Sequence, residues 1–292
     1  MHPLIQKLLL EHPVITDGAW GSQIQSLGLR PGECPDNWNL DNPAAVRQVA
    51  SSYVAAGSRI ILTNTFGANR IMLERHGLSD KAAAINKAGA MISREAAQDA
   101  AFVFGSIGPT GKMAFSGEVT ESELIEAFAE QAIALAEGGV HGFVIETMSE
   151  LAEARSALKA AQQIGLPVVV SMTFDSGKGY ERTMMGITPE EASEELKVAG
   201  ADVIGANCGM GTEYIVSICS RLRSTTNLPI WIKPNAGLPE VFNGSVTYKS
   251  TPESFAGYAM KIQAAGANFI GGCCGTDPEY IRALRRVFSQ KA

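Results

Sequence analysis

The chain has 292 residues, of which 46% are hydrophobic and 18% are charged, a composition typical of a globular protein with a large core. The formal net charge is −6 and no cluster of lysine and arginine forms a basic stripe, which argues against nucleic acid or an anionic membrane as a partner. The apolar run near the amino terminus is short and contains Gln6 and Lys7, and no run reaches the roughly 18 apolar residues of a membrane span. We therefore expect a cytoplasmic protein.

Apolar runs of strand length recur along the whole chain. In chain order they lie at 13–18, within 55–67, at 102–109, within 137–148, at 166–174, within 198–209, at 228–235 and within 264–275. Four of them follow a helix end rich in small residues and a glycine suited to the position after a helix. These glycines, Gly57, Gly139, Gly200 and Gly266, are 82, 61 and 66 residues apart, about twice the minimum length of one βα unit. The pattern predicts eight strands.

Helices are expected in the gaps between these strands. The segments TESE at 120–123, TPEE at 188–191 and TDPE at 276–279 each offer a threonine cap with glutamate three residues later, and TPES at 251–254 offers a threonine cap and a proline. The strands are continuously apolar, as in a parallel sheet that is buried on both faces. We expect one domain, residues 1–292, folded as a (β/α)₈ TIM barrel. A doubly wound open sheet is the alternative, but the glycine-rich dinucleotide turn is missing after the first strand.

Polar residues and glycine follow the predicted strands, and in a barrel these carboxyl ends form the catalytic rim. Two carboxylates, Asp17 and Glu146, fall there, together with the hydroxyl residues Thr63 and Ser171. A carboxylate in this place binds a cation or an amine, or it only caps the next helix. The residues alone leave both roles open.

Cys208, Cys273 and Cys274 also lie at strand ends, and the odd number of cysteines, 5, argues against a disulfide framework. Three thiolates around one point form a soft ligand set that zinc commonly occupies. Adjacent strand residues face opposite ways, so the vicinal pair reaches one ion only where the strand ends and glycines free the backbone, as in GGCCG. No histidine is placed to complete the set, which predicts an open fourth position. A redox pair or plain packing is the alternative, and Cys34 and Cys219 are expected to be packed thiols.

Seven segments together resemble the signature segments of the homocysteine S-methyltransferase family, including the homocysteine-binding barrel of cobalamin-dependent methionine synthase. The likeness runs in order from about Val14 to about Arg285, and the segments lie at the ends of seven of the eight predicted strands: VITDGAWGSQIQ, LTNTFGAN, GSIGPTG, IETMSEL, GANCGMG, KPNAGLPEVFNG and IGGCCGTDPEYI. NCG and GGCCGT are highly specific, whereas DG and ET alone are weak signals. The resemblance implies an enzyme that moves a methyl group to the sulfur of L-homocysteine and gives methionine.

The resemblance also implies the roles of the site residues. A zinc ion would be held by Cys208, Cys273 and Cys274, with the homocysteine sulfur as the fourth ligand. A free alkyl thiol has a pKa of roughly 8.5, so at neutral pH the reactive thiolate needs the metal to stabilise it.

The same resemblance assigns the contacts to the amino acid part of the substrate. Asp17 and Glu146 would receive the substrate ammonium, and the carboxylate would lie near Gly18, Thr63 and Ser171.

The chain departs from some members of the family. Betaine-using members carry tyrosine after the glutamate of the fourth strand, as a spare zinc ligand, whereas here Thr147 follows Glu146. Asn235 or water is then the candidate for the fourth position without substrate. Methionine synthases carry corrinoid and folate modules after the barrel, whereas the sequence ends at Ala292, so we expect a small donor such as S-methylmethionine or a methylated corrinoid on a separate protein.

Two other functions are weighed against methyl transfer. One is a non-catalytic zinc-binding or thiol-binding barrel subunit of a multi-protein methyltransferase. The other is a barrel lyase with an imine lysine, for which Lys233 is the only strand-end candidate, and no phosphate-binding glycine motif follows the seventh strand.

Overall fold

Eight parallel strands close into a barrel, as predicted. The computed structural model describes residues 1–242 and 245–289. The barrel strands are β1 (Val14–Ile15), β2 (Ile60–Leu62), β3 (Phe102–Ile107), β4 (Gly142–Met148), β5 (Val168–Met172), β6 (Val203–Cys208), β7 (Ile230–Pro234) and β10 (Phe269–Ile270). They pair in the order β1-β10-β7-β6-β5-β4-β3-β2, and a parallel bridge between Thr16 and Ile60 joins the two outer strands. The fold is a (β/α)₈ barrel.

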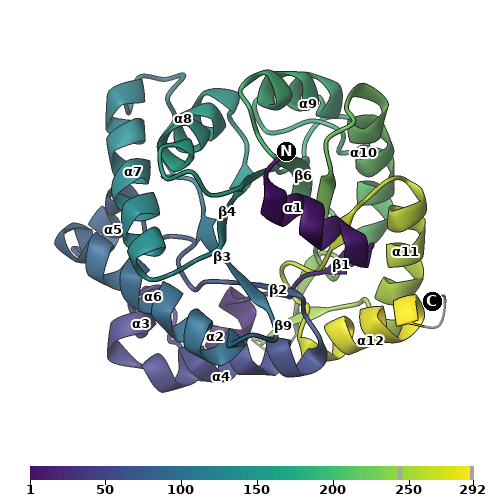
Figure 1. Ribbon diagram of the computed structural model, residues 1–292, viewed down its shortest axis with the longest axis horizontal. Coiled ribbons are helices and arrows are strands. Elements are labelled where there is room, and N and C mark those ends of the chain that lie inside the picture. Colours follow the sequence, from purple (N-terminus) through teal and green to yellow (C-terminus); the bar gives the residue numbers. More distant parts are fainter. Residues whose placement is uncertain (243–244, 290–292) are drawn as a thin grey trace.

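One helix follows each barrel strand, and these eight form the ring around the sheet in Figure 1. They are α4 (Pro43–Ala56), α6 (Ala82–Ala97), α7 (Glu121–Glu137), α8 (Leu151–Gln162), α9 (Pro189–Val198), α10 (Thr212–Thr225), α11 (Pro252–Ala264) and α12 (Pro278–Ser289). Shorter pieces are α1 (Pro3–Leu8), η1 (Leu9–Glu11), α2 (Gly21–Ser26), α3 (Trp38–Asp41), α5 (Arg70–Leu73), η2 (Glu74–His76) and η3 (Ser79–Lys81). Among the described residues, none of these helices has the length and apolar character needed to cross a bilayer.

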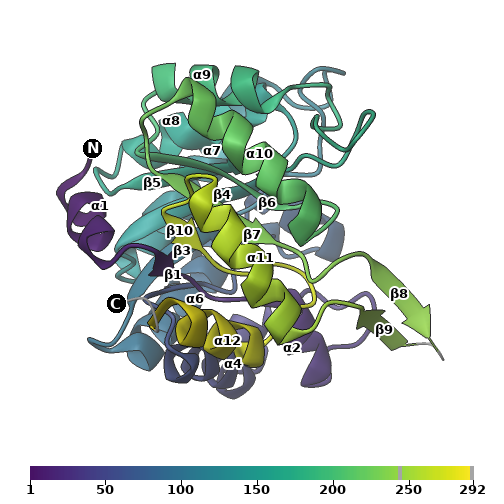
Figure 2. The ribbon, with the colours of Figure 1, turned by 90° about the vertical axis from the view of Figure 1, so that its right-hand side faces the viewer.

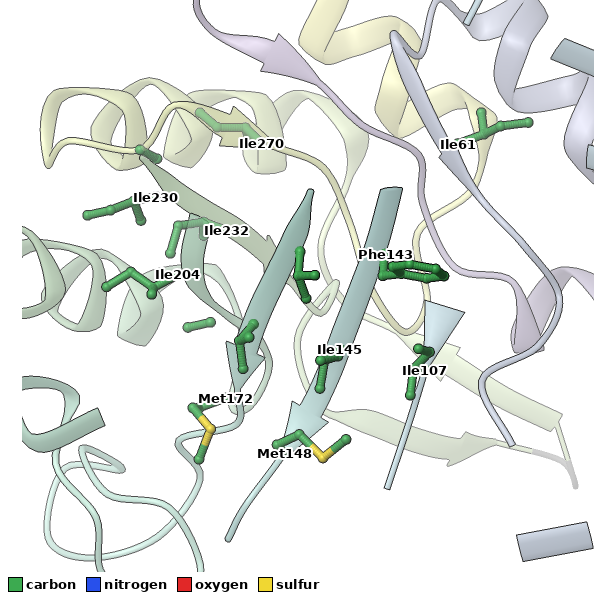
Figure 3. Close-up of a cluster of buried hydrophobic side chains, with 14 of the residues drawn as sticks. Ile61, Ile107, Phe143, Ile145, Met148, Met172, Ile204, Ile230, Ile232 and Ile270 are labelled. Carbon is green, nitrogen blue, oxygen red and sulfur yellow. The ribbon is translucent and has the colours of Figure 1, made fainter. Parts of the chain in front are cut away.

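The strands are apolar on both faces because each face meets a different apolar layer. Side chains such as Ile145, Ile204 and Ile232 point to the surrounding helices and belong to the larger core in Figure 3. Their strand neighbours, among them Val144 and Trp231, fill the barrel interior. Since successive side chains of a strand alternate between its faces, the continuous apolar runs follow directly from this double burial.

The two ends of the barrel are built differently. Helix α1 covers the amino-terminal end, where Ile5 and Leu8 join the interior apolar layer. At the opposite end, strands β8 (Pro239–Phe242) and β9 (Ser245–Tyr248) form an antiparallel hairpin that projects outward in Figure 2. This hairpin was not predicted. It lies between β7 and α11, so it rises from the end of the barrel that carries the carboxyl ends of the strands.

Three of the four predicted helix caps are confirmed. Thr120 and Thr188 each form a complete capping box, and the side chain of Thr251 accepts from the N–H of Ser254. The fourth prediction is wrong: the N–H of Glu279 is bonded to the side chain of Asp277, 2.8 Å away, and not to Thr276. The hydroxyl of Thr276 instead donates to the carbonyl of Cys273 at 2.8 Å and accepts from the N–H of Ala19 at 3.2 Å. It ties the turn after β10 to the loop after β1.

Two parts of the sequence-based predictions reach beyond the described residues. Residues 290–292 belong to the predicted domain 1–292, and Asn243 and Gly244 end the quoted segment KPNAGLPEVFNG.

We expect Gly205→Ala and Gly257→Ala to change stability in opposite directions. A Cβ at Gly205 in β6 would lie 2.0 Å from the carbonyl oxygen of Trp231, whereas a Cβ at Gly257 in α11 meets no atom within 4 Å. Gly205→Ala should lower the free energy of unfolding by about 1–3 kcal/mol, and Gly257→Ala should raise it by about 0.5–1 kcal/mol. Thermal unfolding of both variants measures the two shifts, and equal shifts would contradict the close packing of β6 on β7.

Candidate metal and substrate site

Three cysteines meet at the carboxyl end of the barrel. Their sulfur atoms all lie within 4.8 Å of one another, and Cys208 Sγ is 3.9 Å from Cys274 Sγ. Cys208 ends β6 with a left-handed backbone (φ 63°), which turns it out of the regular strand. The N–H of Cys273 still bonds to the carbonyl of Pro234 at 2.8 Å, and Gly275 (φ 81°) then reverses the chain. The vicinal pair therefore lies where the strand ends, and this placement lets both sulfurs face Cys208.

The spacing of these sulfurs suits a metal ion. For a metal–sulfur distance of about 2.3 Å, tetrahedral geometry places two sulfurs about 3.8 Å apart. A hydrogen bond to Cys208 and burial both raise the pKa of Cys273 above its ordinary value, so the metal-free cluster is protonated at neutral pH. A cation that binds here releases these protons.

A candidate for the fourth ligand lies beside the cysteines. Asn235 follows β7, and its Nδ2 donates to the carbonyl of Gly209 at 2.8 Å. Its Oδ1 is buried and has no hydrogen-bond partner among the described residues. Since a buried polar atom without a partner costs free energy, this oxygen is placed for a ligand that the protein itself does not supply.

Asp17 lies below the cysteines and is completely buried. Its Oδ2 accepts from Trp20 Nε1 and from the N–H of Leu62, both at 2.7 Å, and its Oδ1 is 2.5 Å from Lys233 Nζ. Both oxygens therefore already have donors. Lys233 is thus a cation already paired with Asp17, and a direct contact of Asp17 with the substrate ammonium stays a prediction.

Glu146 is the carboxylate that remains available. It is 7% exposed, and its Oε1 accepts from Ser106 Oγ at 2.6 Å. Its Oε2 has no hydrogen-bond partner in the described part of the chain. Burial raises the pKa of Glu146, while the charge of Lys233 and the bond from Ser106 act in the opposite direction. An ammonium group from the substrate would complete its environment.

The remaining predicted residues lie in the wall of the site. The Thr63 hydroxyl accepts from the N–H of Ser106 at 3.0 Å and is 2.6 Å from Thr65 Oγ1. Ser171 Oγ donates to Asn207 Oδ1 at 2.7 Å, and Gly18 is buried against Thr276. The hydroxyls of Thr63 and Ser171 already have protein partners, so these two side chains form part of the wall of the site and are not free donors.

Sequence reasoning missed the roles of three residues. Lys233 was considered only as an imine lysine, but the structure pairs it with Asp17. Asn207 of β6 contacts β4, β5 and the turn after β10. Tyr248 comes from the hairpin that was not predicted, and its ring lies against Gly275 beside the cysteines. The sequence did indicate that Lys233 and Asn207 face the barrel interior. Side chains alternate along a strand, so Lys233 lies on the same face as Trp231 and Asn207 on the same face as Val203, and Trp231 and Val203 fill the interior.

Comparison with known proteins agrees with this site. The profile of the homocysteine S-methyltransferase family matches residues 14–288. The chain belongs to the homocysteine S-methyltransferase family. The family expected from the sequence is thereby confirmed.

One relative is a much longer protein than this chain. A methionine synthase of Mycobacterium leprae is 28% identical over 295 residues, and the match covers 94% of this chain and 24% of that protein. The chain therefore spans about a quarter of the length of that relative.

Similar solved structures support the fold. The metallated form of the homocysteine methyltransferase MmuM from Escherichia coli matches with a TM-score of 0.78 and 24% identity, over 98% of this chain and 100% of that one. The carboxyl transferase domain of Rhizobium etli pyruvate carboxylase matches with a TM-score of 0.55 and 14% identity, over 97% of this chain and 48% of that one. At these identities the likeness shows a shared barrel.

We expect Lys233→Met to destabilise the protein strongly. It leaves the buried carboxylate of Asp17 without its opposite charge, which typically costs about 3–5 kcal/mol. Lys159→Met is the matched control, because Lys159 forms a surface ion pair with Glu121, is 64% exposed and should contribute less than about 1 kcal/mol. Thermal or urea unfolding compares the two variants, and similar small losses would show that the buried pair carries no special weight.

Proposed function

We propose that the protein transfers a methyl group to the thiolate of L-homocysteine and gives methionine, at a zinc ion held by Cys208, Cys273 and Cys274. The observation that carries the proposal is the convergence of three thiols beside the unpartnered oxygen of Asn235. Family membership supports the same reaction, and so does the metallated form of the similar enzyme MmuM.

The chain's own residues would act by holding and orienting the reactants. When bound, zinc would keep the homocysteine sulfur as a thiolate at neutral pH. Three cysteinates would keep that sulfur electron-rich and nucleophilic, and a bond from it to the methyl carbon would form in line as the bond between that carbon and the demethylated donor breaks. Asn235 would hold the fourth position without substrate and give it up to the homocysteine sulfur. A side-chain base is not required at the attack itself.

Glu146 would receive the substrate ammonium through its free oxygen. Asp17 contributes through Lys233, whose positive charge lies close to Glu146 and Cys273. Burial lowers the pKa of Lys233, but the charges of Asp17 and Glu146 raise it above its ordinary value, so Lys233 stays protonated. The substrate carboxylate is then expected at the backbone of Gly18 and Thr63.

The rim supports a large methyl donor over a small one. Exposed apolar side chains occur in the loops after β2, β3, β5 and β7 and in the first turn of α10, all at the cysteine end: Phe66, Met113, Phe115, Tyr180, Met184, Leu238 and Tyr214. Exposed apolar side chains beside a site are typical of a surface that another molecule covers. We therefore favour a methylated corrinoid carried by a protein over S-methylmethionine as the donor.

The purified protein should contain about one zinc ion per chain. We expect Cys208→Ser and Cys273→Ser to lose it, because each removes one soft ligand. Cys219→Ser is the matched control, since Cys219 is buried and donates to the carbonyl of Ile262 away from the site. Elemental analysis measures the metal, and unchanged zinc in both site variants would contradict the assignment. Zinc that keeps Asn235 as a ligand when homocysteine is added would favour the non-catalytic zinc-binding barrel.

Methylcobalamin should support methionine formation better than the small donors. We would incubate the enzyme and homocysteine separately with methylcobalamin, S-methylmethionine, betaine, S-adenosylmethionine and methyltetrahydrofolate, and measure methionine. Phe115, which is 72% exposed, should be covered by the bound donor, so Phe115→Ser should slow the methylcobalamin reaction by up to about tenfold and leave homocysteine binding unchanged. Faster reaction with S-methylmethionine would overturn the preference for a corrinoid.

A further inference from the structure

The side chain of Asn207 forms hydrogen bonds to three different parts of the barrel. It lies in β6, is 1% exposed, and uses every hydrogen-bonding position of its amide. Oδ1 accepts from the N–H of Thr147 at 2.9 Å and from Ser171 Oγ at 2.7 Å. Nδ2 donates to Thr147 Oγ1 at 2.7 Å and faces Cys273 Sγ at 3.9 Å. One side chain thus joins β4, β5 and the turn after β10.

Thr147 needs this support. Its φ is 61°, in the left-handed region that β-branched residues rarely adopt. The pairing of β4 with β5 shifts register between Ile145 and Met148, so the strand bulges at Glu146 and Thr147. The N–H and hydroxyl of Thr147 both bond to Asn207, and the amide therefore holds the bulge in place.

The bulge sets the position of Glu146. The carboxylate comes from the residue immediately before Thr147, so a change in the backbone at Thr147 moves Glu146. The same amide of Asn207 also contacts Cys273, one of the proposed metal ligands. Asn207 therefore links the two ends of the proposed substrate site, because it bonds to Thr147, the residue after Glu146, and contacts Cys273.

We propose that Asn207 is a positioning residue that fixes the distance between the metal site and Glu146, and that this distance selects homocysteine over cysteine. The inference rests on the proposed function. Homocysteine has one more methylene than cysteine between its sulfur and its amine, so a fixed distance between sulfur and ammonium sites admits one and not the other. A single methylene in a rigid site is worth about 10–200-fold in discrimination.

The test measures binding of homocysteine and of cysteine to the zinc-loaded enzyme by calorimetry. Asn207→Ala should weaken homocysteine binding by about 10–100-fold and weaken cysteine binding less, so the ratio of the two affinities falls toward one. Glu146→Gln should weaken homocysteine binding in the unsubstituted enzyme but add little in Asn207→Ala, because the two changes affect one contact.

Asn86→Ala is the matched control for the loss of a buried amide. Asn86 donates to the carbonyls of Ala68 and Ala82 and accepts from Gln131, outside the site. It should lower the thermal unfolding temperature without changing the homocysteine-to-cysteine ratio. Thr147→Gly tests the same link from its other end: it removes the hydroxyl, suits the left-handed backbone and should also lower the ratio. It decides the question if Asn207→Ala does not fold.

The outcomes separate this inference from the proposed function. If the unsubstituted zinc-loaded enzyme does not bind homocysteine, both are overturned. If it does, and Glu146→Gln weakens binding, then an unchanged ratio in Asn207→Ala or in Thr147→Gly overturns the inference alone. Additive effects of Asn207→Ala and Glu146→Gln overturn it as well.

Discussion

The closure of the barrel and the arrangement of its site both depend on the hydrogen bonds and the ion pair of the buried Asp17 carboxylate. β1 has only two residues, and its seam with β2 is held by one bridge and by the bond from the N–H of Arg59 to the carbonyl of Ile15, 2.7 Å away. Beyond that bridge the Asp17 side chain takes the place of backbone pairing. It accepts a hydrogen bond from the N–H of Leu62 at 2.7 Å and forms an ion pair with Lys233 of β7 at 2.5 Å. Its carbonyl accepts from Gly272 at 3.0 Å. One residue closes the seam and fixes the strand that leads to the cysteines.

This closure also arranges the charges of the site. A buried pair gains stability only when its remaining hydrogen-bonding positions are filled, and the N–H groups of Leu62 and Trp20 fill those of Asp17. Lys233 is then fixed beside Glu146 and Cys273 with its charge already balanced by Asp17. In the described part of the chain Glu146 has no ion pair of its own, and in the proposed function a substrate amine would supply that charge.

Features set by residues adjacent in the chain could be predicted from the sequence, whereas the contacts that close the barrel could not. The glycines around Cys273 and Cys274 predicted a strand end, and the structure brings these two thiols close to Cys208 there. The pairing of Asp17 with Lys233 joins residues 216 positions apart, and no local pattern indicates which partner a strand-end acid takes. Thr276 carries a cap pattern, but the carbonyl of Cys273 competes for its hydroxyl once the turn forms. The hairpin did leave a signal, because Asn243-Gly244 between two short β-prone runs is typical of one. The cytoplasmic location and the absence of nucleic-acid partners stay predictions from composition.

Two of the four non-glycine residues with positive φ in the described part of the chain lie at the site. Gln98 follows α6 and Tyr180 lies in the loop after β5, whereas Thr147 lies in β4 and Cys208 ends β6 at the site. Each such conformation costs of order 1–3 kcal/mol and persists only where the surroundings determine it. The surroundings are the same for both, because Asn207 precedes Cys208 in the chain and bonds Thr147 through its side chain. The turn at Cys208 and the bulge that positions Glu146 are thus two consequences of one residue's position in β6. Loosening either should loosen both, and this is why we place substrate selection in the backbone around Asn207 as well as in the groups that touch the substrate.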